Sequence, residues 1–355
     1  MKKDLFIASR LFNGDSWQDN QVIVTHNGLI EDIISIEIFG KTDDAIQLKN
    51  PIVPSFIDVQ VYGAAGKLLA AYPEAASLAA LYQHCRQGGT HHFLAAVATN
   101  TYDTFYRCID AVRDYRAQGG AGCLGLHIEG PWISKEKRGA HIESLIFSPT
   151  IAQATELLDY GKDVIRMITL APETCSPEVI RLVQSRGIVV SAGHSNISFS
   201  GAMEHFDAGI PAITHLYNAM SPFQHRAPGL VGAAFLHNKV SASIIPDGYH
   251  VDFAAVRLAK QVMKERLFVI TDAVTDTDKG YYPHQRAGDK YESSGILSGS
   301  ALTMRGAVHN LVQHCGIGEE EALRMCSLYP AQLLGLEKEL GRLRKGWQAS
   351  WTEME

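Results

Sequence analysis

Four features that often reveal the class of a protein are missing from this sequence. No apolar run is long enough to cross a membrane, and the apolar run after the basic start is too short for a secretory signal. The six cysteines include no Cys-x-x-Cys pair, so they indicate neither a zinc knuckle nor a disulfide framework. A net charge of −6 gives no general attraction to nucleic acid or to an anionic membrane. We therefore expect a cytoplasmic globular protein with reduced cysteines that binds neither.

The first 49 residues also lack the periodicity of a helix. Two β-branched runs, 21–25 and 29–34, flank His26-Asn27-Gly28. An Asn-Gly pair between such runs is typical of a two-residue β-hairpin. We predict a small antiparallel sheet here, to which the tail from Gly341 returns.

From residue 50 onward, short apolar runs alternate with segments of helical length. The eight runs are Ile52–Gln60, His92–Ala98, Cys123–Glu129, Val164–Leu170, Gly187–Gly193, Ala212–His215, Val240–Pro246 and Leu267–Asp272. Eight such alternations predict an α/β fold, a (β/α)8 barrel of the TIM type. We assign residues 50–337 to this barrel and residues 1–49 with 338–355 to a small β-sandwich domain.

Two segments of the barrel region have weaker patterns. Residues 216–239 are rich in Pro and Gly and are interpreted as a long loop, and so is the segment between Asp272 and Leu297. Two helices are predicted after it, at about 305–315 and 319–334.

Several predicted strands end on residues that bind metals or move protons. The strand–helix–strand pattern from residue 187 to 220 brings His194 and His215 to the same end of a parallel sheet. Alternation places His127 and Glu129 together on the inward face of their strand. One carboxylate and two imidazoles suit zinc or a similar divalent ion, with one position left for water.

Asp272 and Arg226 add two further chemical possibilities. Asp272 ends the last predicted strand, where it is placed to take a proton from such a water. Arg226 lies in a loop shaped by Gly and Pro, where a guanidinium can bind an anion through two hydrogen bonds. Each also has an ordinary explanation, since an aspartate often caps the next helix and an arginine is often a solvated surface side chain. Because these residues and the predicted metal ligands occur together at one barrel rim, we favour a functional site over these ordinary explanations.

Motifs spread along the chain resemble those of the N-acetylglucosamine-6-phosphate deacetylase family, within the metal-dependent amidohydrolase superfamily. The matching segments, in family order, are Leu126–Trp132, Arg138–His141, Gly193–Ser195, Thr214–Met220, Pro228–Gly232, Asp247–Asp252, Thr271–Ala273 and Leu297–Ser300. The resemblance implies a barrel with a small β domain built from both chain ends, which agrees with the pattern of runs.

The resemblance also implies a role for individual residues. Glu129, His194 and His215 would bind one divalent ion, first of all zinc, with iron, cobalt or manganese as alternatives. Asp272 would be the general base and acid, and His141 would polarise the acetamide carbonyl. The implied substrate contacts are Ala140, His141, Asn218, Ala219, Arg226, His250 and Leu297. A homodimer is implied as well, because in some relatives the neighbouring subunit contacts the phosphate.

The sequence departs from many amidohydrolases in two places. The end of the first barrel strand carries Gln60 and Tyr62 instead of the His-x-His that binds a second metal. We therefore predict a single ion, with Gln60 hydrogen-bonded to the water on that ion and no defined role for Tyr62. The tail after Gly346 is also shorter than in the family, so we expect a small domain that is truncated at its C-terminal end.

The implied reaction is hydrolysis of the acetamide of N-acetylglucosamine 6-phosphate by a metal-activated water, within amino-sugar catabolism. The products would be glucosamine 6-phosphate and acetate. Alternatives are a deacetylase of the galacto epimer, another amidohydrolase, and a non-catalytic protein that binds a sugar phosphate. The loops at the barrel rim decide the substrate. The joint presence of Glu129, His194, His215 and Asp272 argues against the non-catalytic protein.

Overall fold

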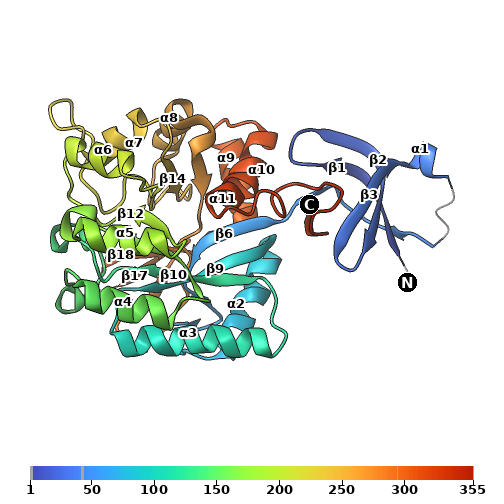
Figure 1. Ribbon diagram of the computed structural model, residues 1–355. Helices are drawn as coiled ribbons and strands as arrows, with labels where there is room; N and C mark the ends of the chain where they lie inside the picture. The colour runs from blue at the N-terminus through green and yellow to red at the C-terminus, as the bar shows by residue number, and fades with distance from the viewer. Residues whose placement is uncertain (1–2, 41–43, 294, 355) are drawn as a thin grey trace.

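The centre of the molecule is an eight-stranded parallel sheet (Figure 1), seen in a computed structural model that describes residues 3–40, 44–293 and 295–354. Its strands, in spatial order, are β6 (Phe56–Val61), β9 (Thr90–Ala98), β10 (Cys123–Glu129), β11 (Ile165–Leu170), β12 (Val189–Ala192), β13 (Ala212–Ile213), β14 (Ser241–Ile244) and β15 (Leu267–Val269). Backbone hydrogen bonds from Asp272 N to Gln60 O (3.0 Å) and from Tyr62 N to Ala273 O (2.9 Å) link the chain after β15 to β6. The predicted (β/α)8 barrel is confirmed.

Helices surround this barrel on the outside, as the alternating pattern predicts (Figure 1). They are α2 (Ala75–Gln87), α3 (Tyr102–Ala117), α4 (Ile151–Tyr160), α5 (Pro177–Ser185), α6 (Phe199–Asp207), α7 (Gly229–Leu236), α8 (Phe253–Met263), α9 (Met304–Gln313), α10 (Glu319–Cys326) and α11 (Leu328–Leu333). Six of them begin where a Ser, Thr or Asp side chain accepts a hydrogen bond from a backbone N–H of the first turn. Such caps satisfy donors that the helix itself leaves unpaired.

A second, mostly antiparallel sheet contains segments from both ends of the chain. It consists of β1 (Asp4–Phe12), β2 (Trp17–His26), β3 (Leu29–Ser35), β4 (Ile46–Gln47), β5 (Ile52–Pro54) and β19 (Trp351–Glu353), and the short helix α1 (Ile36–Phe39) follows β3. The predicted hairpin is present, with Asn27 and Gly28 at φ 50° and 76°. The tail returns as predicted, because β19 pairs antiparallel with β5.

The predicted first barrel strand, 52–60, is in fact two strands that belong to different sheets. Val53 in β5 pairs with Thr352, and the barrel strand β6 begins only at Phe56. Ser55 lies between them and bonds Ser350 through both its backbone N–H (3.2 Å) and its hydroxyl (2.7 Å). Both sheets bury the run, and every residue from 52 to 60 is buried, so no exposed position marks the change of partner. The division into two domains stays a prediction.

Three further segments differ from the sequence-based expectation. The predicted loop at 216–239 contains α7. Six of the eight residues of α7 are buried, so the helix has no polar face that would show a helical period in the sequence. The predicted loop before Leu297 forms a three-stranded antiparallel sheet of β16 (Gln285–Ala287), β17 (Lys290–Ser293) and β18 (Ile296–Ser300). The helix predicted at 319–334 is interrupted at Ser327 (φ −129°, ψ −66°), which places Pro330 in the first turn of α11, where no donor is needed.

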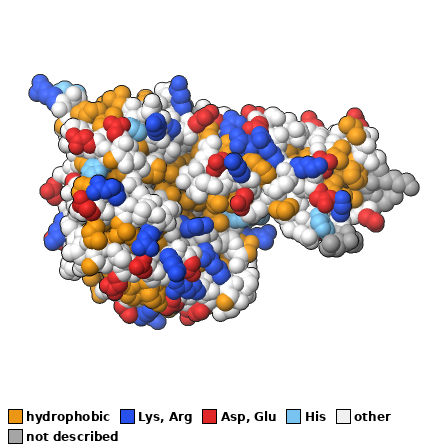
Figure 2. All heavy atoms as spheres, in the orientation of Figure 1, with side chains coloured by type: hydrophobic (Ala, Val, Ile, Leu, Met, Phe, Trp, Pro, Cys, Tyr) orange, Lys and Arg blue, Asp and Glu red, His pale blue; other side chains and the backbone are white. Residues whose placement is uncertain are grey.

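The surface carries charges of both signs side by side over the barrel and over the projecting terminal sheet (Figure 2). This mixture agrees with the small net charge of the sequence. Among the described residues, no helix is both long and apolar enough to cross a membrane.

We expect the protein to lose stability as the pH falls, in part through His92. Burial lowers the pKa of this imidazole from 6.5 to about 4, and its ring lies 3.1 Å from the Ser350 hydroxyl. Between these two values the unfolded chain binds a proton that the folded chain does not, so the free energy of unfolding falls from pH 7 to pH 5. His92→Asn should reduce that fall by about 1 kcal/mol, allowing for partial exposure of the ring.

Urea unfolding at the two pH values measures this difference. His309→Asn is the control, since His309 is exposed and should leave the fall unchanged. An equal fall in wild type and His92→Asn would contradict the assignment.

Candidate metal centre and pocket

Three donor atoms from separate strand ends meet at the barrel rim. Glu129 ends β10, and His194 and His215 follow β12 and β13. The Oε1 atom of Glu129 lies 3.3 Å from Nε2 of His194 and 3.0 Å from Nε2 of His215. The two Nε2 atoms are 3.1 Å apart. The structure therefore brings together the three residues predicted as metal ligands, all of them buried.

These separations between donor atoms fit a cation with tetrahedral coordination. Bonds of about 2.0–2.1 Å to zinc place two ligands about 3.3–3.4 Å apart. His194 donates from Nδ1 to the Lys137 carbonyl (2.9 Å), since a carbonyl only accepts, and its Nε2 then presents a lone pair to the centre. A histidine ligand typically has this partner on its other nitrogen. The donors present thus suit a divalent ion.

Several of these residues have a left-handed backbone conformation, which orients their side chains. His194, His215 and Asp272 have φ of 47°, 35° and 54°. Ala219 and Tyr217, on the loop after His215, also have positive φ (51° and 79°). Non-glycine residues seldom adopt this conformation, and it occurs most often where a site over-determines it. Five of the nine such residues in the described part of the chain belong to this rim.

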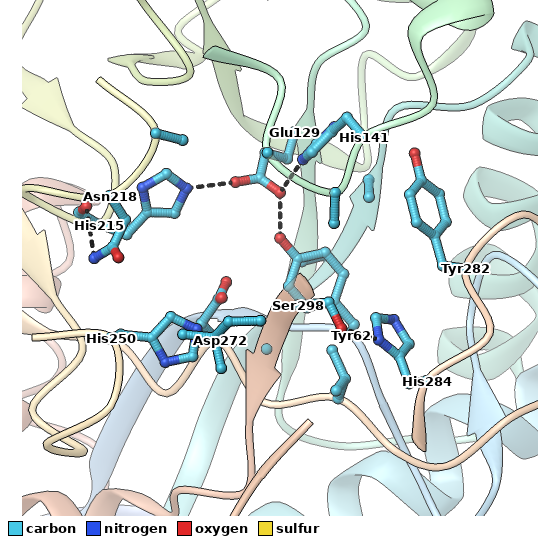
Figure 3. Close-up of a pocket in the computed structure, with 18 of the residues that line it drawn as sticks. Tyr62, Glu129, His141, His215, Asn218, His250, Asp272, Tyr282, His284 and Ser298 are labelled. Atoms are coloured by element: carbon cyan, nitrogen blue, oxygen red, sulfur yellow. Dashed lines mark hydrogen bonds and ion pairs between the residues drawn. The ribbon is translucent and has the colours of Figure 1, made fainter. Parts of the chain in front are cut away.

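Glu129 remains ionised although it is buried. Burial opposes its charge, but the surrounding imidazoles of His141, His194 and His215 outweigh burial and hold its pKa well below the usual range. The two oxygens face different partners. Oε1 faces His194 and His215, whereas Oε2 lies 3.3 Å from Nε2 of His141. His141 is thus a fourth donor near the centre, on the other side of the carboxylate (Figure 3).

Asp272 lies beside this cluster and is tied to it by Gln60. The Gln60 amide nitrogen lies 2.7 Å from Asp272 Oδ1 and 3.0 Å from Glu129 Oε1. Burial and the charge of Glu129 raise the pKa of Asp272. Gln60 thus lies next to Glu129 and Asp272, and its predicted hydrogen bond to a metal-bound water stays a prediction.

A pocket of about 260 Å³ opens above the cluster (Figure 3). Besides the three ligands, its lining contains the predicted residues Ala140, His141, Asn218, Ala219, His250, Asp272 and Leu297. Arg226 is exposed on the loop between β13 and α7 and is not part of this lining. Among the predicted contacts that the structure describes, only Arg226 lies outside the pocket wall.

His250 is oriented by an aspartate. Its Nδ1 lies 2.6 Å from Asp247 Oδ2, and its backbone N–H donates to Asp247 Oδ1 (2.7 Å). Hydrogen bonds with His250 lower the pKa of Asp247, although burial acts in the opposite direction. The Nε2 atom of His250 is then the ring nitrogen available to a bound molecule.

His127 points inward, as alternation predicts, but it lies deeper than the pocket. Its ring nitrogens pair with Val59 O (2.9 Å) and with the Thr169 hydroxyl (2.7 Å). Both nitrogens are therefore used within the barrel core, and His127 is a structural residue.

Four polar residues of the pocket lining have no role predicted from the sequence. Tyr62 donates its hydroxyl to Glu129 Oε2, Tyr282 donates to Thr99 O (2.6 Å), and His284 pairs with Ser298 (2.9 Å). Tyr62 is two residues after Gln60, so alternation alone could have placed it inward. His284 directly precedes β16 in the segment that the sequence predicts as a loop, and Ser298 lies in β18, within the matching segment Leu297–Ser300.

Comparisons with known proteins agree with this geometry. Residues 52–352 match the Amidohydrolase family. The N-acetylgalactosamine-6-phosphate deacetylase of Escherichia coli O157:H7 is 31% identical over 97% of this chain and 93% of its own length. The N-acetylglucosamine-6-phosphate deacetylase of Homo sapiens is 36% identical over 86% and 79%. The crystal structure of N-acetylglucosamine-6-phosphate deacetylase from Pasteurella multocida superposes with a TM-score of 0.93, at 31% identity, covering 99% of this chain and 95% of that one.

Removing one of the three donors should abolish metal retention. We expect His194→Asn to bind zinc at least about 100-fold more weakly, because loss of a mere neighbour of a ligand already weakens binding by 10- to 100-fold. Competition with a chelator and elemental analysis measure the change. His250→Asn is the matched control, since His250 lines the same pocket but is held by Asp247. Equal zinc affinity of the two variants would refute the assignment.

Proposed function

The chain belongs to the amidohydrolase family, and we propose that it hydrolyses the acetamide of N-acetylglucosamine 6-phosphate to glucosamine 6-phosphate and acetate. The observation that carries the proposal is the convergence of Glu129, His194 and His215 beneath a pocket that Asp272 also lines. Relatives of both the gluco and the galacto specificity span most of the chain. The enzyme would act in amino-sugar catabolism.

One divalent ion would be held by Glu129, His194 and His215. Zinc is the first candidate, and iron, cobalt or manganese suit the same donors. When bound, such an ion acts as a Lewis acid and lowers the pKa of a bound water to about 7.

Asp272 is proposed as the group that moves the proton. It lies beside the ligands, and the Gln60 amide holds its Oδ1 at 2.7 Å, which orients the carboxylate. A carboxylate in this position takes a proton from the attacking water and returns it to the nitrogen of the leaving amine.

His141 is proposed to stabilise the charge that develops on the acetamide oxygen. Its Nδ1 lies 2.7 Å from the Thr99 hydroxyl, whereas that hydroxyl lies 3.4 Å from the Glu129 carbonyl. Donation from Thr99 to Nδ1 therefore dominates and leaves the proton on Nε2, which faces the pocket. Burial lowers the pKa of His141 to about 4, so the ring is neutral. A donor of this kind contributes about 3 kcal/mol to catalysis.

The rest of the pocket would position the sugar. Asn218 and His250 lie together on one side of the cluster in Figure 3, and Ala219 shares the loop of Asn218. These residues and Ala140 would contact the sugar, and Leu297 would cover the acetyl group. Arg226, on the same loop as Asn218, would meet the phosphate at the pocket mouth. We also propose a homodimer, in which the neighbouring subunit adds to the phosphate contact.

The galacto epimer is the second candidate substrate, because the Escherichia coli relative of that specificity matches 97% of this chain. Acetate release from both 6-phosphorylated epimers, with and without a chelator, tests both proposals. Faster release from the gluco epimer, abolished by the chelator, is expected. Binding of either sugar phosphate without acetate release would instead indicate a non-catalytic binding protein.

Asp272→Asn should lower kcat by about 100- to 10,000-fold, because an amide cannot accept the proton. Zinc content, measured by elemental analysis of the same sample, should remain that of the wild type. Near-normal acetate release by this variant would show that another group is the base.

Arg226→Ala should raise KM for the phosphorylated sugar about tenfold or more and leave kcat unchanged. The expected size follows from the loss of a hydrogen bond to a charged group. N-acetylglucosamine without the phosphate is the control substrate, and its KM should not change. If KM for the phosphorylated sugar is also unchanged, Arg226 does not contact the phosphate.

A further inference from the structure

Two buried carboxylates lie close together at the rim without a fixed charge between them. Glu129 Oε1 and Asp272 Oδ1 are 3.0 Å and 2.7 Å from one atom, the Gln60 amide nitrogen. Two carboxylates that converge in this way are a natural donor pair for a cation. Here a neutral amide occupies the space between them.

Hydrogen-bond chemistry decides which way this amide points. The amide nitrogen carries two hydrogens and lies within 3.0 Å of three acceptors, the third being the Tyr62 hydroxyl at 2.9 Å. Rotating the amide would turn the Gln60 oxygen toward two anions, which repel it. The Gln60 N–H groups therefore face the two carboxylates, and an amide N–H cannot be a ligand of a cation between them.

Tyr62 completes the same side of the cluster. Its hydroxyl receives the Gln60 N–H and donates its own proton to Glu129 Oε2. Without this hydrogen bond, both carboxylate oxygens of Glu129 would be open to an ion. The hydrogen bond to Oε2 therefore makes the two oxygens different. Oε2 is occupied by Tyr62 and by His141 at 3.3 Å, while Oε1 faces His194 and His215. Figure 3 shows Tyr62 pointing at Glu129 from the opposite side of the pocket.

We propose that Tyr62 is a positioning residue for the metal centre. Its phenol holds Glu129 so that Oε1 alone is offered to the ion bound by His194 and His215, and together with Gln60 it closes the centre to a second cation. The proposal rests on the proposed function only in requiring that the centre binds a divalent ion.

Metal binding by the full-length protein tests this without reference to turnover. Tyr62→Phe removes only the hydroxyl and should weaken Co²⁺ binding by about 10- to 100-fold, still with one ion per chain. The visible absorption of bound Co²⁺ should change too, because it reports the number and arrangement of ligands. Tyr282→Phe is the matched control. Tyr282 lines the same pocket, but its hydroxyl bonds the Thr99 carbonyl, so Co²⁺ affinity and spectrum should stay those of the wild type.

The double substitution Gln60→His with Tyr62→His tests the closing of the centre. It replaces two donors with two potential ligands, and the ions bound per chain at saturation should rise from one to two. If that variant does not fold, as judged by thermal unfolding, Tyr62→His alone should still bind more than one ion per chain. One ion per chain in the folded variant would overturn the exclusion of a second cation.

The outcomes separate this proposal from the proposed function. A Tyr62→Phe protein with the Co²⁺ affinity and spectrum of the wild type would overturn the role of Tyr62, even if acetate release is confirmed. Weakened binding in Tyr62→Phe would support that role, even if no acetate is released. Absence of metal binding by the wild-type protein would overturn both.

Discussion

The buried carboxylate of Glu129 is the interaction on which the rest of the rim depends. An ionised group without water needs compensation from hydrogen bonds and from opposite charge. Glu129 receives hydrogen bonds from Gln60 and Tyr62 and faces three imidazoles. These partners come from four separate segments of the chain, so the barrel must close accurately for the charge to be tolerated.

Closure of the barrel also fixes the position of Asp272. The backbone bonds that join β6 to the chain after β15 connect residues directly beside the site, namely Gln60 with Asp272 and Tyr62 with Ala273. The same contact that completes the sheet therefore sets the separation between the proposed base and the proposed ligands. Stability and chemistry share these residues, which explains why strained backbone is retained there.

Much of this arrangement could be predicted from particular residues. Parallel strands place their carboxyl ends at one rim, so His194 and His215 had to lie near each other once a strand–helix–strand unit was recognised. Alternation placed Glu129 and His127 inward. Alternation could not show that His127 lies one layer deeper, where both of its ring nitrogens are hydrogen-bonded to Val59 and Thr169. Depth along a strand depends on the register with its neighbours, and a single sequence carries no register.

The sequence by itself determined the alternation of elements, the set of donor residues and the rim to which they belong, because these follow from local periodicity and from the polarity of parallel strands. Only the tertiary structure decided that 52–54 joins the terminal sheet, that β16–β18 brings His284 and Ser298 to the pocket, and that Tyr62 bonds Glu129. These contacts join residues far apart in the chain. Their partners are selected by packing and by the need to satisfy buried polar groups, and no local pattern encodes that choice.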